Sequence, residues 1–193
     1  MRLSRRLAGP LAAVLVAVGT TAATAMPASA ATVAPYFRIG VAPQGSSFLR
    51  CLQGDLGGPL GSTVTQQPCN PDLTDASQLW LPLALGGNIY KFENIGTGRC
   101  LEARNGAVNG GAVDLWPCAS TESNERWYWP PSATAGGSPF PGPNPIQTRV
   151  SGSTGFCLDV PGAQTTPGLQ LQTWRCNGTL AQQFWVAQQP AGI

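Results

Sequence analysis

The sequence predicts an all-β protein built from three repeats. Short alternating or apolar runs such as NIYKFEN, AVDLW and LQLQTW are separated by turns that contain Gly or Asn, a pattern typical of β-strands. No segment keeps a helical period long enough to predict a helix. The six cysteines fall in three pairs, separated by 18, 18 and 19 residues, which indicates an internal repeat.

Residues 1–30 are predicted to be a secretory signal peptide that precedes the fold. MRLSRR is a basic start, residues 11–18 form an apolar run too short to span a bilayer, and residues 28–30 read ASA, a small-residue cleavage pattern. The letters SRR also fit a twin-arginine signal, but Ala8 stands where a bulky apolar residue is usual, so ordinary secretion is preferred. We therefore expect one secreted, extracellular domain over residues 31–193.

The composition argues against several classes of function. Residues 31–193 hold eight basic and nine acidic residues, so no positive charge favours nucleic acid or an anionic membrane as partner. The sequence contains no histidine, which removes the commonest general base and the commonest metal ligand. We expect no metal, no cofactor, no nucleic acid and no membrane insertion.

The cysteines are expected to form disulfides within each repeat. An even number of cysteines in an exported chain is typical of a disulfide framework. Six cysteines allow fifteen pairings in principle, but the internal repeat favours Cys51–Cys69, Cys100–Cys118 and Cys157–Cys176. Each bridge would stabilise the fold by about 3 kcal/mol. A zinc site does not fit, because the spacing is too wide and histidine is missing.

Other residues follow the same repeat. A leucine comes after each first cysteine, at Leu52, Leu101 and Leu158. The motifs SQLW, NERW and QQFW close the units at Trp80, Trp127 and Trp185, and we expect these tryptophans in the core. The repeats cover about residues 36–86, 87–129 and 146–189. Residues 130–145, rich in Pro and Gly, are predicted to be an inserted loop.

Three units of Cys-Leu…Gln-x-Trp, each with its own cysteine pair, resemble the ricin-B-type β-trefoil lectins, also classed as family-13 carbohydrate-binding modules. The resemblance covers about residues 36–186. It implies a β-trefoil with pseudo-threefold symmetry, capped by hairpins, with up to one shallow sugar site in each unit. The implied function is a secreted, non-catalytic lectin that binds a glycan or polysaccharide, with galactose- or xylose-type sugars expected.

The third unit carries the sugar-binding pattern of that family. In LQLQTW, Gln172 and Trp174 alternate with Leu171, so they face the opposite side of the strand, where an indole can stack against a pyranose ring. Asp159, two residues after Cys157, can accept hydrogen bonds from two vicinal hydroxyls. The resemblance assigns sugar binding here to Asp159, Gln172, Trp174, Gln182 and Gln183, with Gln182 standing where asparagine is usual.

The second unit keeps an aromatic platform but changes the hydrogen-bonding groups. Trp116, Asp114 and Asn124 stand at the expected positions, while Glu102 replaces an aspartate and Glu125 replaces a glutamine. The three carboxylates would repel one another and raise a pKa. Sugar binding by this unit stays open.

The first unit is expected not to bind sugar, because Gln53, Gln67 and Ser77 replace the aspartate, the aromatic residue and the asparagine.

Two alternatives to a lectin stay open. The first is a trefoil that has lost sugar binding and recognises or inhibits proteins through its loops. The second is a glycoside hydrolase, in which Glu102 with Asp114 or Glu125 would supply carboxyl groups about 5 or 6.5–9.5 Å apart. We predict that the chain is not an enzyme.

Overall fold

The structure is a computed structural model, and it describes residues 36–41, 50–71, 74–119, 121–130, 143–150 and 155–188. The predicted signal peptide, residues 1–30, lies outside the described residues. So does most of the predicted insertion, of which only Pro130 and residues 143–145 are described. The chain divides into two units, residues 1–32 and residues 33–193, and every described residue belongs to the second of them.

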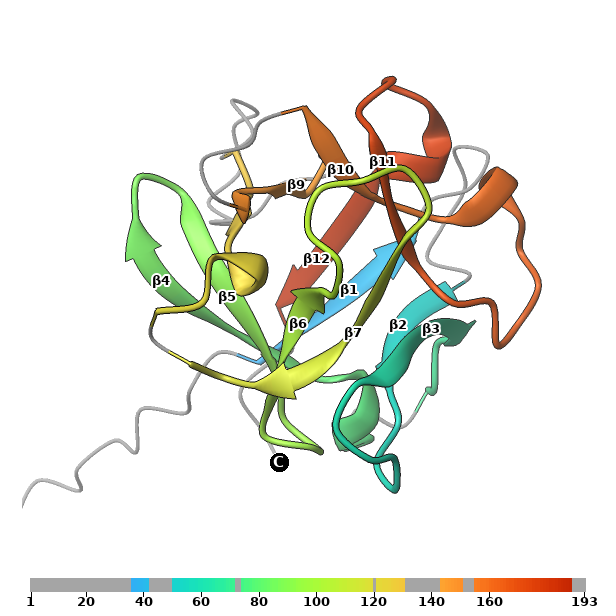
Figure 1. Ribbon diagram of the computed structural model, residues 1–193. Helices are drawn as coiled ribbons and strands as arrows, with labels where there is room; N and C mark the ends of the chain where they lie inside the picture. Colours follow the sequence, from blue (N-terminus) through green and yellow to red (C-terminus); the bar gives the residue numbers. More distant parts are fainter. Residues whose placement is uncertain are drawn as a thin grey trace, which may run out of the picture. The chain divides into compact units, whose positions relative to one another are not determined.

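The described residues form an all-β fold, as the sequence predicts (Figure 1). The strands are β1 (Phe37–Val41), β2 (Arg50–Gly54), β3 (Ser62–Pro68), β4 (Trp80–Gly86), β5 (Ile89–Asn94), β6 (Arg99–Ala103), β7 (Gly111–Pro117), β8 (Trp127–Tyr128), β9 (Gln147–Thr148), β10 (Phe156–Asp159), β11 (Gln172–Arg175) and β12 (Phe184–Gln188). Single turns of 3-10 helix connect some of them: η2 (Ala76–Gln78), η3 (Ser123–Glu125), η5 (Pro161–Ala163) and η6 (Leu180–Gln182).

Strand pairing follows a threefold pattern. Each repeat has one hairpin, β2–β3, β6–β7 or β10–β11, and the hairpin joins the strand before it. The hairpins also pair with one another: β3 with β7 and β7 with β11, while Gln170, two residues before β11, forms a bridge with Thr65 of β3. The strands β1, β4, β5, β8 and β9 pair in series, and β12 pairs with β1. This is the β-trefoil arrangement that the resemblance implies.

The three predicted disulfides are confirmed: Cys51–Cys69, Cys100–Cys118 and Cys157–Cys176. Each bridge spans one hairpin, with Cα atoms 4.9, 5.0 and 5.1 Å apart. The register is also the same in each hairpin, because the first cysteine faces the residue two positions before the second. These facing residues are Gln67, Trp116 and Trp174.

The core repeats in the same way. Leu52, Leu101 and Leu158, which follow the first cysteines, are fully buried. Trp80 and Trp127 are buried as predicted, and the Nε1 of each donates to the backbone oxygen of Leu52 at 3.1 Å and of Leu101 at 2.9 Å. These hydrogen bonds satisfy the indole donors inside an apolar core.

The prediction that Trp185 is a core residue is wrong. Along β12 the side chains alternate, so Phe184 and Val186 are buried while Trp185 is half-buried on the other face. Phe184 is fully buried and takes the position that Trp80 and Trp127 hold in the other repeats. The motif QQFW offers two adjacent aromatic residues, and the strand buries the first of them.

Candidate functional site

The hairpin β10–β11 of the third repeat brings three of the predicted site residues together. Asp159, at the end of β10, faces Gln172 across the hairpin, and Trp174 faces Cys157 two positions further along. Leu171 and Thr173 are buried, whereas the Trp174 side chain between polar neighbours is 39% exposed. The alternation predicted from LQLQTW therefore places the indole on the surface, next to the buried carboxyl of Asp159.

Two side-chain amides fix both oxygens of the Asp159 carboxyl. Gln172 Nε2 donates to Oδ1 at 2.7 Å and Gln182 Nε2 donates to Oδ2 at 3.1 Å. Asp159 is only 4% exposed. Burial raises its pKa above the ordinary value near 3.8, and the hydrogen bonds from Gln172 and Gln182 act in the opposite direction. The carboxyl is held in one orientation before any ligand arrives.

Gln182 also ties the site to the loop that follows the disulfide. Its Oε1 accepts from the backbone N–H of Asn177 at 2.8 Å, and its Nε2 donates to the backbone oxygen of Arg175 at 3.1 Å. Gln183, which the sequence groups with Gln182, is half-buried and does not line the pocket beside Asp159. The structure therefore brings Gln182 into the site and leaves Gln183 outside it.

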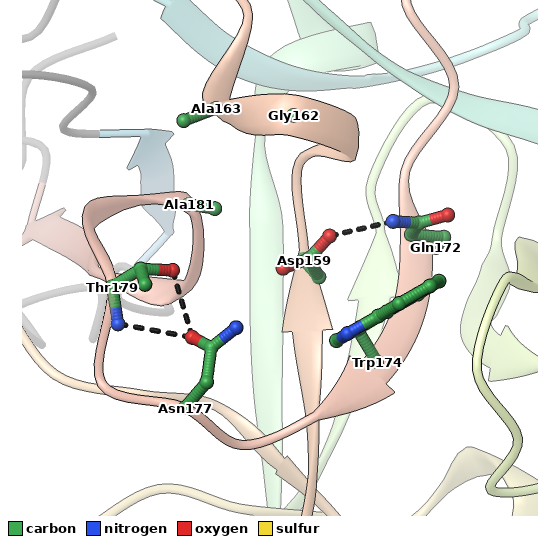
Figure 2. Close-up of a pocket in the computed structure, with 8 residues that line it drawn as sticks. All are labelled: Asp159, Gly162, Ala163, Gln172, Trp174, Asn177, Thr179 and Ala181. Carbon is green, nitrogen blue, oxygen red and sulfur yellow. Dashed lines mark hydrogen bonds between the residues drawn. The ribbon is translucent and has the colours of Figure 1, made fainter.

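Asp159, Gln172 and Trp174 border a surface pocket of about 340 Å³ (Figure 2), and the buried Gln182 holds Asp159 from behind without lining it. Figure 2 shows Asp159 in the middle, with Gln172 and Trp174 on one side and Asn177 and Thr179 on the other. The pocket is lined by Asp159, Gly162, Ala163, Gln172, Trp174, Asn177, Thr179 and Ala181.

Sequence reasoning missed Asn177 and Thr179, although the local pattern contains a signal for them. In Asn-Gly-Thr, directly after Cys176, the Asn177 Oδ1 accepts from the Thr179 backbone N–H at 3.0 Å and from its hydroxyl at 2.7 Å. Such a turn is a common use of an asparagine followed two residues later by threonine. Gly162 and Ala163, also missed, both have positive φ, of 62° and 52°, and form the tight turn above the pocket.

The second repeat has a comparable pocket of about 460 Å³, lined by Leu60, Gly61, Glu102, Arg104 and Trp116. Glu102 faces Asp114 across the β6–β7 hairpin, and the Trp116 side chain is 40% exposed. Burial first, and then the charge of Asp114, raise the pKa of Glu102 to about 7. Asn124 makes a side-chain hydrogen bond with Glu102.

Arg104 distinguishes this second pocket from the third-repeat pocket. Its guanidinium forms an ion pair with Asp114 and donates to the backbone oxygen of Gly61, which comes from the first repeat. The guanidinium therefore occupies acceptors that a sugar hydroxyl would otherwise use. Sequence reasoning missed Arg104, because it lies outside the repeated motif.

The predicted repulsion among the three carboxylates is present, because after burial the charges of Asp114 and, to a lesser degree, Glu125 both raise the pKa of Glu102. Glu125 is fully buried and forms an ion pair with Lys91, and its oxygens also accept from the Ala119 backbone N–H. The ion pair with Lys91 gives Glu125 a partner of opposite charge, and Glu125 contributes less than Asp114 to the raised pKa of Glu102. The close carboxyl pair of this repeat is therefore Glu102 with Asp114.

The first repeat forms a polar pocket without an aromatic platform. Gln67 stands where Trp116 and Trp174 stand in the other hairpins, and the Oε1 of Gln53 accepts from Gln78 Nε2 at 3.0 Å. Ser77 is bound by Asp75 through its backbone N–H, at 3.1 Å. The residues bordering this pocket of about 520 Å³ include Gln53, Asp55, Thr65, Gln67 and Ser77.

Within the part of the chain that the structure describes, no group of three or more His, Cys, Asp or Glu side chains could hold a metal ion. Among the same residues, no helix has the length and apolar character needed to cross a membrane.

Comparison with known proteins places the fold in one family. The family described as "Ricin-type beta-trefoil lectin domain-like" matches residues 34–116 and 142–192 of the chain. Among curated proteins, none matches.

Several solved structures share the fold at low sequence identity. A designed threefold symmetric protein, ThreeFoil, is 22% identical with a TM-score of 0.62, over 78% of this chain and 96% of that one. The C-half of the earthworm R-type lectin, in complex with GalNAc, is 15% identical with a TM-score of 0.59, over 80% and 99% of the two chains. An exo-β-1,3-galactanase from Clostridium thermocellum is 20% identical with a TM-score of 0.62, over 81% of this chain but only 31% of the enzyme.

Proposed function

The chain belongs to the ricin-type β-trefoil lectin domain-like family, and from this premise we propose that it is a secreted, non-catalytic carbohydrate-binding protein. Its principal site is the pocket of the third repeat, with Trp174 as the stacking surface and Asp159 as the main hydrogen-bond acceptor. Gln172 and Gln182 orient the acceptor, and Asn177 and Thr179 border the opposite side. In this proposal Gln183 takes no part in sugar binding.

One observation carries the proposal: an exposed indole stands beside a buried carboxyl that is held from both sides. A large aromatic surface in water is unfavourable unless a ligand covers it, and the C–H face of a pyranose fits a flat indole. The pocket of about 340 Å³ has the size of a small-molecule site. Its one ionisable lining group, Asp159, suits the hydroxyls of an uncharged sugar.

The hydrogen-bond capacity of Asp159 is sufficient for two sugar hydroxyls. Each carboxylate oxygen has two lone pairs, and in this structure each accepts one amide N–H, from Gln172 or from Gln182. One further acceptor direction on each oxygen can therefore take a vicinal hydroxyl. Because the group is buried, a hydrogen bond to it is stronger than the same bond in open water.

The second repeat would contribute a weaker site. Trp116 supplies a platform, but the ion pair between Arg104 and Asp114 competes with sugar hydroxyls. A single shallow site corresponds to a Kd in about the millimolar to micromolar range. Retention on a polysaccharide would then depend on two sites on one chain, which raise the effective concentration.

Secretion and removal of residues 1–30 belong to the same proposal. Three disulfides favour an oxidising compartment, which supports export. N-terminal sequencing of the protein recovered from the medium tests it, with a new N-terminus at residue 31 as the expected result.

A glycan array, followed by titration calorimetry with the sugars that bind, tests the function. We expect binding to galactose- or xylose-containing glycans, and a loss of at least about tenfold for Trp174→Ala and for Asp159→Asn, since each removes a central contact worth more than 1.4 kcal/mol. Trp116→Ala is the comparison variant: it removes the equivalent indole of the weaker second-repeat site, so it should cost less binding than Trp174→Ala. Full binding by both third-repeat variants would contradict the proposal.

A further inference from the structure

A second cavity lies beside the third-repeat pocket, on the other side of Gln172. This cavity, called here the inter-repeat pocket, has a volume of about 270 Å³. It lies where the loop before β7 of the second repeat meets β11 of the third. Its walls include Gly110, Ala112, Pro161, Leu169, Gln170 and Gln172.

The two pockets are contiguous at three points. Gln172 lines both of them. Pro161 of the inter-repeat pocket is followed directly by Gly162 of the third-repeat pocket. A Cβ atom placed on Gly110 would lie 3.9 Å from Cζ3 of Trp174, so the loop of the second repeat reaches the edge of the exposed indole. The inter-repeat pocket therefore borders the third-repeat pocket at Gln172.

The amide of Gln172 can serve both pockets at once. Its Nε2 donates to Asp159 Oδ1 in the third-repeat pocket. Figure 2 shows the amide oxygen of Gln172 on the side away from Asp159. Because Gln172 also lines the inter-repeat pocket, we infer that this oxygen is the acceptor it offers there.

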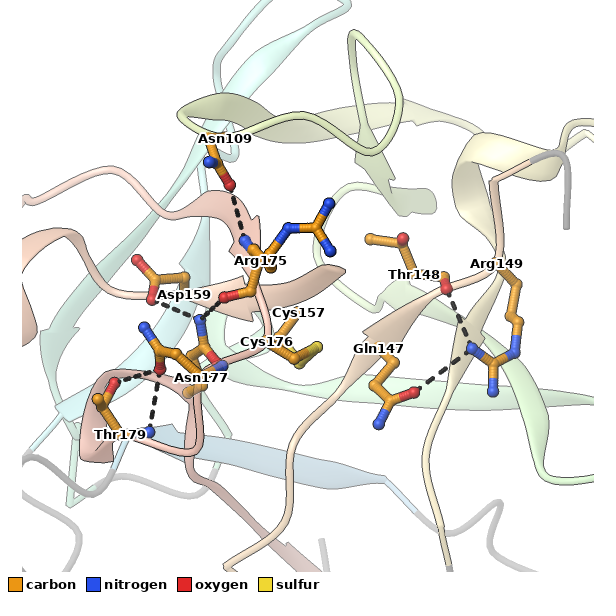
Figure 3. Close-up of a disulfide and its surroundings, with 11 residues drawn as sticks. Asn109, Gln147, Thr148, Arg149, Cys157, Asp159, Arg175, Cys176, Asn177 and Thr179 are labelled. Carbon is orange, nitrogen blue, oxygen red and sulfur yellow. Dashed lines mark hydrogen bonds between the residues drawn. A yellow bond between two sulfur atoms is a disulfide. The ribbon is translucent and has the colours of Figure 1, made fainter. Parts of the chain in front are cut away.

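The walls of the inter-repeat pocket are held by direct contacts between the two repeats. Ala112 faces Gln172, and Gly111 faces Thr173, in the pairing of β7 with β11. The Thr173 hydroxyl donates to the backbone oxygen of Val108 at 2.7 Å. In the next residues of the same segments, the Arg175 backbone N–H donates to Asn109 Oδ1 at 2.8 Å (Figure 3). The cavity is thus formed before a ligand binds, which lowers the entropic cost of binding.

The lining of the inter-repeat pocket fits an uncharged sugar. None of its lining residues is ionisable. Pro161, Ala112 and Leu169 offer apolar carbon surface, and the amides of Gln170 and Gln172 offer donors and acceptors. Carbon surface together with a few amides matches a ring that has a C–H face and neutral hydroxyls, whereas a uronic acid would lose hydration without meeting a cation.

We propose that the third-repeat site extends into the inter-repeat pocket and binds at least two consecutive neutral sugar units. The first unit stacks on Trp174, and the second lies between Ala112 and Pro161, hydrogen-bonded by Gln170 and Gln172. This inference rests on the proposed carbohydrate-binding function. It makes the preferred ligand an oligosaccharide or a polysaccharide end, not a single sugar.

Calorimetric titration with matched sugars tests the extension. The probes are galactose against β-1,3-galactobiose, and xylose against xylobiose, each added to the protein without residues 1–30. We expect one disaccharide to bind at least about tenfold more tightly than its monosaccharide. Ala112→Phe, which fills the inter-repeat pocket, should remove this gain and leave monosaccharide binding unchanged. Ala84→Phe, on an exposed position of β4 outside both pockets, is the matched control.

A second variant guards against a fold change caused by the added ring. Gln170→Ala removes one amide without adding volume, and it should weaken disaccharide binding alone. Equal affinity for monosaccharide and disaccharide, or variants that weaken both equally, would overturn the extension and leave the proposed function in place. Absence of binding to any of the four sugars and to the glycan array would overturn both.

Discussion

Gln182 makes in the third repeat the hydrogen bonds that Gln78 makes in the first. The Oε1 atoms accept from the backbone N–H of the residue after the second cysteine, Asn177 at 2.8 Å and Asn70 at 2.9 Å. The Nε2 atoms donate to the backbone oxygen of the residue before that cysteine, Arg175 at 3.1 Å and Pro68 at 3.0 Å. Gln182, not Gln183, is therefore the repeated glutamine, and it alone of this pair reaches Asp159.

Substitution of the two adjacent glutamines should separate their roles. Gln182→Ala removes three hydrogen bonds, one of which leaves the buried Asp159 carboxyl without a partner on Oδ2, so we expect the free energy of unfolding to fall by about 2 kcal/mol and sugar binding to be lost. Gln183→Ala, the matched control one residue away, should change stability by no more than about 0.5 kcal/mol. Urea unfolding and calorimetric titration measure both effects. Equal losses in the two variants would show that the assignment of the repeated position is wrong.

The same one-residue shift predicts which aromatic residue of QQFW stabilises the core. Phe184 is fully buried, so Phe184→Ala should lower the free energy of unfolding by about 3–5 kcal/mol. Trp185 lies on the other face of β12 and is half-buried, so Trp185→Ala should cost roughly half of that or less. Chemical unfolding of the two variants at one temperature provides the comparison. A larger loss for Trp185→Ala would contradict the assignment.

The fold could be predicted from the sequence because its markers are covalent or repeated. The spacing of cysteines such as Cys51 and Cys69 predicts the bridges, and the leucines after the first cysteines mark the buried face. In the third closing motif the sequence alone does not fix the repeated position, because QQFW contains two glutamines and two aromatic residues, and the structure places it one residue earlier than the pattern predicts. The alternation of side chains along β12 decides which aromatic residue is buried, and the hydrogen bonds of Gln182 decide which glutamine is the repeated one. Neither can be deduced from the motif QQFW alone.

The parts of the site that involve two repeats could not be predicted in the same way. Arg104 closes the second pocket by contacting the backbone oxygen of Gly61, which is 43 residues away in the chain. The inter-repeat pocket likewise joins Ala112 of one repeat to Pro161 of another. Reasoning within one repeat identifies Asp159 and Trp174, whose contacts are local to a hairpin, and misses contacts that depend on how the hairpins meet.

Acidification should weaken binding at the third repeat without unfolding the protein. Sugar hydroxyls donate to the ionised Asp159 carboxylate, so binding weakens as pH falls through its pKa, which burial raises above 3.8. For stability the sign is opposite, because a raised pKa means that the folded protein holds the proton more tightly than the unfolded chain. Calorimetric titrations between pH 7 and pH 3, with circular dichroism at each pH, measure both quantities. Binding that is unchanged down to pH 3, well below the ordinary value of 3.8, would contradict the acceptor role of Asp159.

Glu102 should make the protein more stable in mild acid than at alkaline pH. Burial and the charge of Asp114 raise its pKa to about 7, so between its ordinary value of 4.5 and about 7 the folded state holds a proton that the unfolded chain releases. The free energy of unfolding therefore falls as pH rises across this window, by on the order of 2–3 kcal/mol. Urea unfolding of the wild-type protein, of Glu102→Gln and of the exposed-site control Glu122→Gln, at pH 5 and pH 8, measures the difference. Asp159 shifts stability with pH in the same direction, so the test compares the variants' free energy of unfolding with that of the wild-type protein. Glu102→Gln should make the difference between pH 5 and pH 8 smaller. An unchanged difference in that variant would refute the assignment.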